Sequence, residues 1–317
     1  MAIKGRRDVY IPETGEFAEV AVYDGHALTH GHRIEGPAMI QARPDDSHKG
    51  TFGRVLVLGG SRGMVGAPAL CASAAFRAGA GLVHLAVPEP IQLSVAVLCE
   101  CATSTPLSDA MGAGELAPLL EAATAIAVGP GWGVGPVQQS ALLQALACGK
   151  PLVIDADGLN NLAAMPGWAS HASAPIVLTP HPGEFARLTG RTADAIAADR
   201  QLAAVEYAKE INDAAYHADA NVTLVLKGAG TIVTDGAQVY VNQTGNAGLA
   251  TGGTGDVLTG LIAGRIAAGE TAFEAAVQGT FVHGMAGDIA AKELSQTAMM
   301  ATDLLETIPH AIAEIAP

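Results

Sequence analysis

Residues 242–267, NQTGNAGLATGGTGDVLTGLIAGRIA, place a glycine-rich loop directly before a helix. Glycine occupies five of the eleven positions from 245 to 255. The residues that follow recur at helical spacing and put four aliphatic side chains on one face, Leu258, Leu261, Ile262 and Ile266. The first N–H groups of a helix have no partner inside it, and the helix dipole favours negative charge there. We therefore expect an anion site at Gly253, Thr254 and Gly255.

Asp256 stands at the start of this predicted helix, beside the anion site. Its carboxylate repels a resting phosphate by charge, but it can accept the proton of a hydroxyl group that attacks one. Phosphoryl transfer, with Asp256 as the base, is the chemistry that this arrangement favours.

The composition excludes several classes of protein. A net charge of -14 and an aromatic content of 4% argue against a nucleic-acid surface, which needs a basic footprint and stacking rings. The start, MAIKGRRDVY, has no apolar signal core, and no uncharged apolar run reaches the roughly 18 residues that span a bilayer. The cysteines show no zinc spacing and no disulfide framework is expected, so we predict a cytoplasmic protein without a membrane or nucleic-acid partner.

Residues 44–317 alternate buried strands with helices and are predicted to form one α/β domain. Strands are expected at residues 54–58, 82–87, 125–128, 151–154, 175–178 and 222–226, with a hairpin at 232–241. Helices are expected at residues 67–78, 136–147, 199–213, 271–292 and 302–315. Apolar strands of this kind are typical of a mostly parallel sheet covered by helices on both faces. The carboxyl ends of such strands share one edge, where open α/β sheets bind ligands.

Several loops at that edge carry polar candidates. The glycine loop at 59–66 departs from the dinucleotide-binding pattern, and a tight turn explains it about as well as a ligand contact does. His181 lies between Pro180 and Pro182 in an extended loop, where it either binds a ligand or is satisfied by the backbone. For Asp157 we favour an N-cap over a ligand role.

Lys227, Gly228, Ala229, Gly230 and Thr231 connect two strands without room for a helix. This segment brings backbone N–H groups and one ammonium close together, as nucleotide binding requires. It is not a Walker A loop, because the Gly-Lys pair of the chain, Gly149-Lys150, is followed by Pro151. A tight strand connection explains the segment equally well.

Residues 1–43 form an N-terminal extension of unclear role, with β-prone runs at 9–11 and 20–23. The extension resembles the C-terminal segment of hydantoinase or oxoprolinase type A subunits, with Tyr23-Asp24, Leu28, Gly31 and Gly36-Pro37-Ala38 in matching places. The likeness includes no catalytic residue of that family, and we transfer no function from it. His26, His30 and His32 match no standard metal-ligand spacing, so we favour a solvated turn over a metal site.

The motifs together closely resemble the ADP-dependent NAD(P)H-hydrate dehydratases of the ribokinase-like superfamily. The residues that carry the likeness are Lys49-Gly50, Gly59-Gly60-Ser61, Gly66-Ala67, Gly129-Pro130-Gly131, Asp155-Ala156-Asp157-Gly158 and the segments 179–184, 227–231 and 246–256. The resemblance implies a ribokinase-like three-layer α/β/α fold. It also implies repair of the S-epimer of hydrated NADH and NADPH, with ADP as co-substrate and AMP and phosphate as products.

The resemblance further implies roles for individual residues. Ala67, Gly131, His181 and Asp256 would contact the hydrated dinucleotide, with Asp256 as the catalytic base. The adenine nucleotide would be held by Lys227, Gly228, Ala229, Gly230, Thr231 and Gly255. Mg²⁺ is expected on the nucleotide phosphates, with protein ligands that the sequence does not assign. We also expect a homo-oligomer, a homotetramer by resemblance, and a separate epimerase acting on the same metabolite, because the extension is too short to be one.

Two other functions use the same residues. A ribokinase-like kinase of a small alcohol, such as a hydroxymethylpyrimidine or a sugar, would need the same loop and aspartate. A non-catalytic nucleotide sensor would bind without turnover. The choice between ADP and ATP, and between the NADH and NADPH forms, stays open at the level of sequence.

Overall fold

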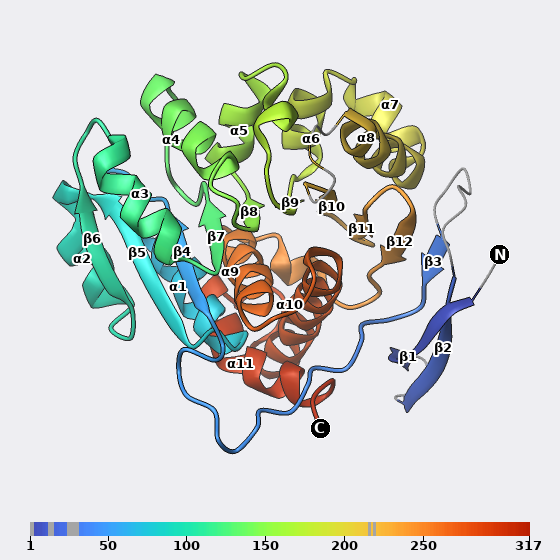
Figure 1. Cartoon of the computed structure of the whole chain (residues 1–317). Coiled ribbons are helices and arrows are strands. Elements are labelled where there is room, and N and C mark those ends of the chain that lie inside the picture. The colour runs from blue at the N-terminus through green and yellow to red at the C-terminus, as the bar shows by residue number, and fades with distance from the viewer. Residues whose placement is uncertain (1–2, 12–15, 24–31, 215–216, 218–219) are drawn as a thin grey trace.

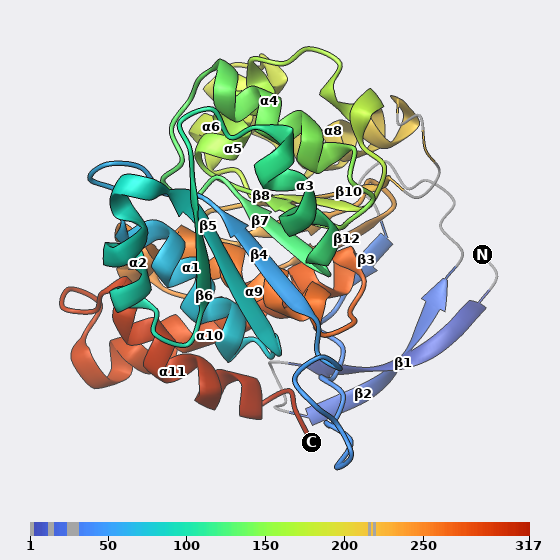
Figure 2. The same cartoon turned by 60° about the vertical axis from the view of Figure 1, so that its left-hand side comes forward.

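The computed structural model describes residues 3–11, 16–23, 32–214, 217 and 220–317, and of the first two segments it describes the backbone alone. His26 and His30 lie outside these residues, as do Asp24, Leu28 and Gly31. Figures 1 and 2 show a central sheet with helices on both sides, which confirms the predicted α/β architecture.

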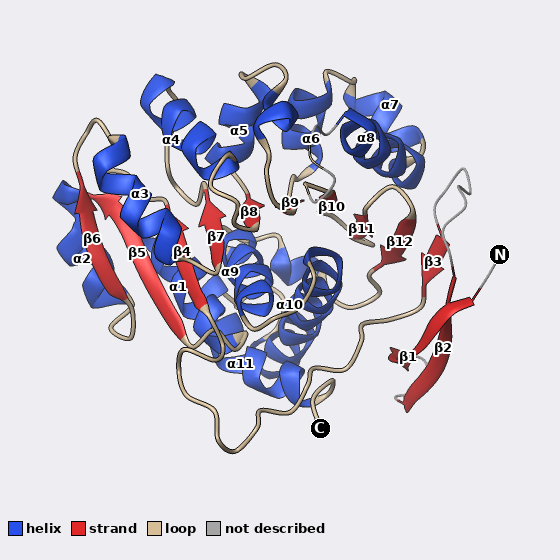
Figure 3. Cartoon of the chain, in the orientation of Figure 1, coloured by secondary structure: helices blue, strands red, loops and turns tan. Residues whose placement is uncertain are grey.

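The sheet has ten strands in the order β3-β12-β11-β10-β9-β8-β7-β4-β5-β6. Their bounds are β3 His32–Ile34, β4 Arg54–Leu58, β5 Leu82–Pro88, β6 Thr103–Leu107, β7 Ala125–Val128, β8 Leu152–Ile154, β9 Ile176–Leu178, β10 Val222–Leu226, β11 Ile232–Thr234 and β12 Gln238–Val241. All neighbours are parallel except β11, which pairs antiparallel with both β10 and β12 (Figure 3). Each predicted strand lies within one residue of its expected bounds, and the predicted hairpin is β11–β12.

The helices pack on the two faces because alternate strand residues point to opposite sides. Val55 and Val57 of β4 face a core shared with α1 (Gly66–Arg77), α9 (Thr254–Ala267) and α10 (Ala272–Leu294). Leu56 and Leu58 face the core on the other side. The helices with side chains in that second core are α3 Ala113–Ala122, α4 Pro136–Leu146, α5 Asp157–Ala163, α6 Pro182–Thr189, α7 Ala193–Ala198 and α8 Arg200–Ala214.

The remaining elements lie at the margins of this body. Helix α2 (Gln92–Leu98) packs beside β6, and α11 (Ala301–Ala313) packs against α10. Three short 3-10 helices, η1, η2 and η3, are Glu89–Ile91, Trp168–His171 and Ala247–Leu249. No helix in the part of the chain that the structure describes has the length and apolar character that crossing a membrane requires.

The N-terminal extension divides into two parts. Strands β1 (Ile3–Ile11) and β2 (Glu16–Tyr23) form an antiparallel sheet of their own. Strand β3, which lies within the predicted extension, pairs with β12 at the edge of the main sheet. Ile40 is buried, and its backbone N–H donates to the carbonyl oxygen of Ile315 at 2.8 Å. The segment before residue 44 is therefore partly built into the main body.

Close contact between α1 and α9 fixes the helix that carries Asp256. A Cβ atom on Gly260 would overlap the carbonyl oxygen of Cys71, and one on Gly264 would lie 2.5 Å from the carbonyl oxygen of Ala75. Only glycine allows the two backbones to approach this closely. The start of α9 is thereby held at the edge of the sheet where β4, β7 and β8 end.

Candidate active site

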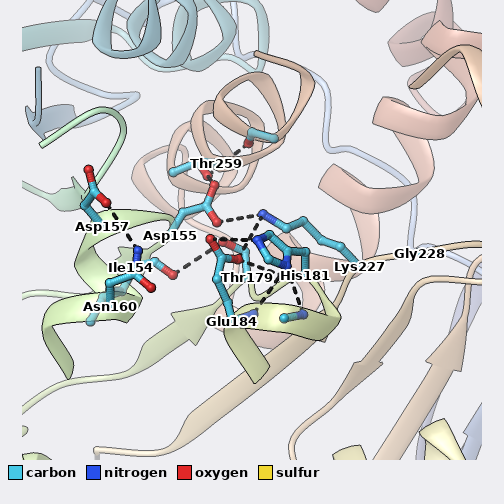
Figure 4. A network of polar contacts seen from close by, with 12 residues as sticks. Ile154, Asp155, Asp157, Asn160, Thr179, His181, Glu184, Lys227, Gly228 and Thr259 are labelled. Atoms are coloured by element: carbon cyan, nitrogen blue, oxygen red, sulfur yellow. Dashed lines mark hydrogen bonds and ion pairs between the residues drawn. The ribbon is translucent and has the colours of Figure 1, made fainter. Parts of the chain in front are cut away.

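The loops that follow β8, β9 and β10 meet the first turn of α9 at one edge of the sheet. They contribute Asp155, His181 with Glu184, and Lys227, and α9 contributes Asp256 and Thr259. Figure 4 shows the polar contacts among the loop residues and Thr259. Residues far apart in the sequence are thus brought together as expected for an open parallel sheet.

The N-terminus of α9 presents free backbone donors. Gly253 is the N-cap, with a left-handed φ of 95°, and the helix begins at Thr254. The first bond within the helix runs from the N–H of Val257 to the carbonyl oxygen of Gly253 at 3.2 Å. Among the described residues, the N–H groups of Gly255 and Asp256 have no acceptor. Of the residues predicted for the anion site, Thr254 already donates its N–H to the carbonyl oxygen of Thr251 at 3.4 Å, whereas Gly255 keeps its N–H available for an anion.

The carboxyl group of Asp256 is suited to proton transfer near neutral pH. Burial raises its pKa to about 7, and the negative charge of Asp155 adds to this effect while Lys227 opposes it. No hydrogen bond within the described residues occupies the Asp256 carboxylate. A base with a pKa near the working pH is the most effective in general catalysis.

Lys227 and Asp155 form a buried ion pair. The Nζ atom of Lys227 lies 2.7 Å from Oδ1 of Asp155 and 3.9 Å from Oε2 of Glu184. The second oxygen of Asp155 accepts a hydrogen bond from the Thr259 hydroxyl at 2.8 Å. Burial alone would lower the pKa of Lys227, but Asp155 and Glu184 outweigh it and raise the pKa above its usual value. Lys227 is therefore a fixed positive charge at the site.

His181 is the N-cap of α6. Its Nδ1 accepts hydrogen bonds from the N–H groups of Gly183 at 3.0 Å and Glu184 at 3.3 Å, so that in the neutral ring Nε2 carries the proton. The Glu184 carboxylate accepts the N–H of His181 at 2.8 Å in return. The backbone alternative is thus confirmed at Nδ1, while half of the side chain, 51%, stays exposed. The Nε2 atom lies 3.4 Å from Oε1 of Glu184, and a hydrogen bond from the neutral ring to a ligand would also be donated by Nε2.

A cavity of about 530 Å³ lies beside the ion pair. All six predicted nucleotide-binding residues line it, namely Lys227, Gly228, Ala229, Gly230, Thr231 and Gly255. His283 of α10 also lines it, and its Nε2 donates to the carbonyl oxygen of Thr254 at 2.8 Å. Burial lowers the pKa of His283 to about 4, so the ring is neutral at physiological pH.

Arg200 fixes the shape of the loop that lines this cavity. Its guanidinium donates to three carbonyl oxygens, those of Ala229 at 2.7 Å, Lys227 at 3.1 Å and Leu226 at 3.3 Å. The loop therefore has a defined conformation before any ligand binds, which reduces the entropy lost on binding.

Ala67 and Gly131, two residues predicted to contact the dinucleotide, lie close to each other. A Cβ atom on Gly131 would lie 3.2 Å from that of Ala67, so the loop after β7 contacts the start of α1. Gly131 has a left-handed φ of 61°, and its carbonyl oxygen accepts a hydrogen bond from Ser61 at 2.8 Å. Neither residue lines the 530 Å³ cavity. The sheet order places the β8 end, with Asp155, between these two residues and Lys227.

The sequence prediction for Asp157 is wrong in detail. The N-cap of α5 is Ala156, which has a left-handed φ of 47°, and Asp157 is the first residue of the helix. The Asp157 carboxylate instead accepts the N–H of Gly133 at 2.7 Å. This hydrogen bond connects the loop after β7 to the start of α5, which follows β8.

The sequence reasoning also missed four residues, Asp155, Glu184, Thr259 and His283. Asp155 follows a buried strand directly, which is a signal for a site at the sheet edge. Glu184 stands three residues after His181, which is the spacing of a capping box. Thr259 and His283 lie within helical patterns and carry no comparable signal.

The described acidic, cysteine and histidine side chains do not gather into a metal-binding group. Within residues 32–317, apart from the short undescribed gaps, no group of three or more His, Cys, Asp or Glu side chains could hold an ion. Asp155 has both oxygens occupied by Lys227 and Thr259.

Comparison with known proteins identifies the fold. A crystal structure of the ADP/ATP-dependent NAD(P)H-hydrate dehydratase of Bacillus subtilis, co-crystallised with ATP/Mg²⁺, superimposes with a TM-score of 0.73 at 30% identity, over 86% of this chain and 93% of that chain. A ribokinase-like superfamily protein of Enterococcus faecalis gives 0.73 at 27% identity, over 93% and 99%. The predicted ribokinase-like fold is thereby confirmed.

The sequence comparisons agree. A bifunctional NAD(P)H-hydrate repair enzyme Nnr of Moorella thermoacetica is 42% identical over 289 residues, which are 88% of this chain and 52% of that protein. The chain thus spans about half the length of several curated relatives that it matches. The ADP-dependent (S)-NAD(P)H-hydrate dehydratase of Neisseria meningitidis is 38% identical over 88% of its own length and 89% of this chain. The family model described as NAD(P)H-hydrate dehydratase matches residues 55–310, and the chain belongs to this family.

Proposed function

We propose that this chain dehydrates the S-epimer of hydrated NADH or NADPH at the expense of ADP, giving the reduced cofactor, AMP and phosphate. The observation that carries the proposal is the position of Asp256. This carboxyl has a pKa of about 7 and lies in the first turn of α9, whose free N–H groups lie beside a cavity lined by Lys227. The names of the Neisseria and Bacillus relatives support the same reaction.

The residues suggest the following steps. Asp256 takes the proton of the ring hydroxyl, and the hydroxyl oxygen attacks the terminal phosphorus of ADP. The bond from that phosphorus to the bridging oxygen breaks, and AMP leaves. The ring nitrogen then donates its electron pair as the carbon–oxygen bond of the phosphate ester breaks. This cleavage releases phosphate and leaves a positive charge shared by the ring nitrogen and that carbon. Loss of a proton from the neighbouring carbon to water or phosphate then completes the double bond.

We propose that each of the two substrates binds to a different part of the site. Lys227, Gly228, Ala229, Gly230, Thr231 and Gly255 are proposed to hold the adenine nucleotide. Ala67, Gly131 and His181 are proposed to contact the hydrated dinucleotide, with the Nε2 proton of His181 as donor. The N–H groups of Gly255 and Asp256 would stabilise the transferring phosphoryl group, and loss of one such donor costs about 3 kcal/mol.

Mg²⁺ is proposed as the companion of the nucleotide. It neutralises charge on the phosphates during transfer, and in such sites it is held mainly by phosphate oxygens and water. The lack of a three-residue ligand group among the described residues fits this mode of binding. We further propose that the protein forms a homo-oligomer and is located in the cytoplasm. We also propose that an epimerase supplies the S-epimer.

Turnover distinguishes the proposal from its alternatives. The purified chain is incubated with hydrated NADH, Mg²⁺ and ADP, and in parallel with ADP or ATP and a panel of small alcohols. Return of the absorbance of reduced nicotinamide supports the dehydratase. Phosphorylation of an alcohol without that return supports the kinase, and binding without either reaction supports the sensor.

A further inference from the structure

Asp155 lies at the centre of the site but has no part in the steps above. Its side chain is 2% exposed, and both oxygens are bonded, one to Lys227 at 2.7 Å and the other to Thr259 at 2.8 Å (Figure 4). A carboxylate whose two oxygens already accept strong bonds is a poor base. The role of Asp155 must therefore differ from that of Asp256.

The two partners of Asp155 belong to different halves of the phosphate site. Lys227 lines the nucleotide cavity from the loop after β10. Thr259 lies in α9, and its hydroxyl is also 3.1 Å from the carbonyl oxygen of Gly255. A Cβ atom on Gly255 would lie 3.4 Å from Nζ of Lys227 and 3.7 Å from Oδ2 of Asp155. The ammonium, the carboxylate and the first turn of α9 are thus in direct contact.

The backbone around Asp155 is held tightly. The N–H of Asp155 donates to Val128 at 3.0 Å, and its carbonyl oxygen accepts from Gly158 at 2.8 Å. The next residue, Ala156, has a left-handed φ of 47° that L side chains rarely adopt. Such a conformation persists only where the surrounding structure over-determines it, and it is common at functional sites.

We infer that Asp155 is a positioning residue for phosphoryl transfer, which fixes the Lys227 ammonium against the free N–H groups of α9 so that both meet the same phosphate. The inference rests on the proposed function, since it concerns the same reaction. Misplacement of such groups by about 1 Å can cost roughly a hundredfold in rate. The bonds of Asp155 resist that misplacement.

Asp155 also acts on Asp256 through its charge. The charged groups that face Asp256 are Asp155 after β8, Asp157 on α5, Glu184 on α6 and Lys227 after β10. The nearby thiol of Cys71 on α1 has a pKa that burial raises well above its usual value, so it carries no charge. The negative charge of Asp155 raises the pKa of Asp256, whereas the positive charge of Lys227 lowers it. Removal of the Asp155 charge should therefore lower the pKa of Asp256. A merely structural role would not produce this shift.

The test uses the full chain and four variants. Asp155→Asn removes the charge and keeps the shape. Thr259→Val removes one hydrogen bond and keeps every charge, and Thr259→Ser is its conservative counterpart. Asp235→Asn is the matched control, because Asp235 accepts backbone N–H groups of Ala237 and Gln238 in the hairpin turn at the opposite end of β11. For each we measure ADP affinity by calorimetry, kcat and KM with hydrated NADH, and the pH profile of kcat/KM.

Asp155→Asn is expected to lower kcat about 10- to 100-fold, to weaken ADP binding and to move the acidic limb of kcat/KM to lower pH. Thr259→Val is expected to lower kcat about fivefold, as for one lost hydrogen bond. The acidic limb of its kcat/KM profile should stay at the parental pH. Thr259→Ser is expected to recover the loss. Asp235→Asn is expected to match the parent.

An Asp155→Asn variant with parental kcat overturns the inference, as does a slow variant whose acidic limb is unmoved. If Asp155→Asn does not fold, the comparison of kcat between Thr259→Val and Thr259→Ser tests the inference. Equal kcat values for these two variants overturn the inference. Failure of the proposed function looks different, because the parent chain itself then shows no turnover of hydrated NADH.

Discussion

Nζ of Lys227 and Oδ1 of Asp155 lie 2.7 Å apart, although 72 residues separate them in the chain and strand β9 lies between the strands that carry them. This pair sets the electrostatics of the phosphate site. The lysine holds one positive charge beside the cavity, and the aspartate keeps that charge in place. Asp256, beside both, is left without a hydrogen-bond partner among the described residues and is free to act as a base.

Asp256→Asn is expected to lower kcat for dehydration by about 10²- to 10⁴-fold, the contribution of a positioned base. ADP affinity should change little, because the phosphate donors are backbone N–H groups and Lys227. Steady-state kinetics with hydrated NADH and calorimetry with ADP measure the two effects. The control is Asp303→Asn, since Asp303 accepts the N–H of Met300 at the start of α11. Parental turnover in Asp256→Asn would contradict the assignment of the base.

Asp256→Asn should also stabilise the fold at high pH. The folded-state pKa of Asp256, about 7, lies above the value of 3.8 for a free aspartate, so the folded protein binds this proton more tightly than the unfolded chain. The charged form therefore costs stability as pH rises from about 4 to 7, and the full cost persists above pH 7. The cost is on the order of a few kcal/mol, since a tenfold shift in proton affinity is about 1.4 kcal/mol.

Thermal unfolding of the parent and of Asp256→Asn at about pH 4 and about pH 8 measures this effect. The variant should melt higher at pH 8, and the two proteins should converge at pH 4. A gain in Tm that is equal at both pH values would show that ionisation of Asp256 does not destabilise the folded parent.

Arg200→Lys should weaken ADP binding while leaving kcat within a few-fold of the parent. The planar guanidinium donates to three carbonyl oxygens of the nucleotide loop, and an ammonium cannot reproduce that fork. We expect KM for ADP to rise about 5- to 20-fold, as for the loss of one or two hydrogen bonds. Arg191→Lys is the matched control, because its partner Glu206 lies on the surface. An unchanged KM for ADP would mean that the loop keeps its shape without Arg200.

His283→Phe should raise KM for ADP about fivefold, because the ring would no longer donate to Thr254 at the start of α9. Since burial lowers the pKa of His283 to about 4, its contribution to ADP affinity should be constant from about pH 6 to pH 9. Calorimetry across that range measures it, with the exposed His310→Phe as control. A contribution that disappears as pH rises through 7 would show that the charged imidazole is the binding form.

The sequence predicted the sheet well because its strands are buried on both faces. Strands 54–58, 125–128 and 222–226 have the predicted bounds, since apolar runs between glycine and proline turns are typical of parallel strands. Strands β3 and β6 were not predicted. They are the two edge strands, and HRI and TSTPL lack a continuous apolar run, so only pairing with a neighbour identifies them.

The site was predictable where it follows local patterns. A loop of glycines before a helix indicated the free N–H groups of α9 and placed Asp256 beside them. The pairing of Asp155 with Lys227 depends on strand order, which no local pattern encodes. The hydrogen-bonding state of His181 was also open, because it depends on how α6 begins.

The central claim is tested most directly by mixing the purified chain with S-epimer hydrated NADH, Mg²⁺ and ADP, and following the absorbance of reduced nicotinamide together with AMP. Absorbance is expected to return with one AMP formed for each NADH, and Asp256→Asn is expected to slow both by about 10²- to 10⁴-fold. Absorbance that does not return, or that returns without AMP, would contradict this claim.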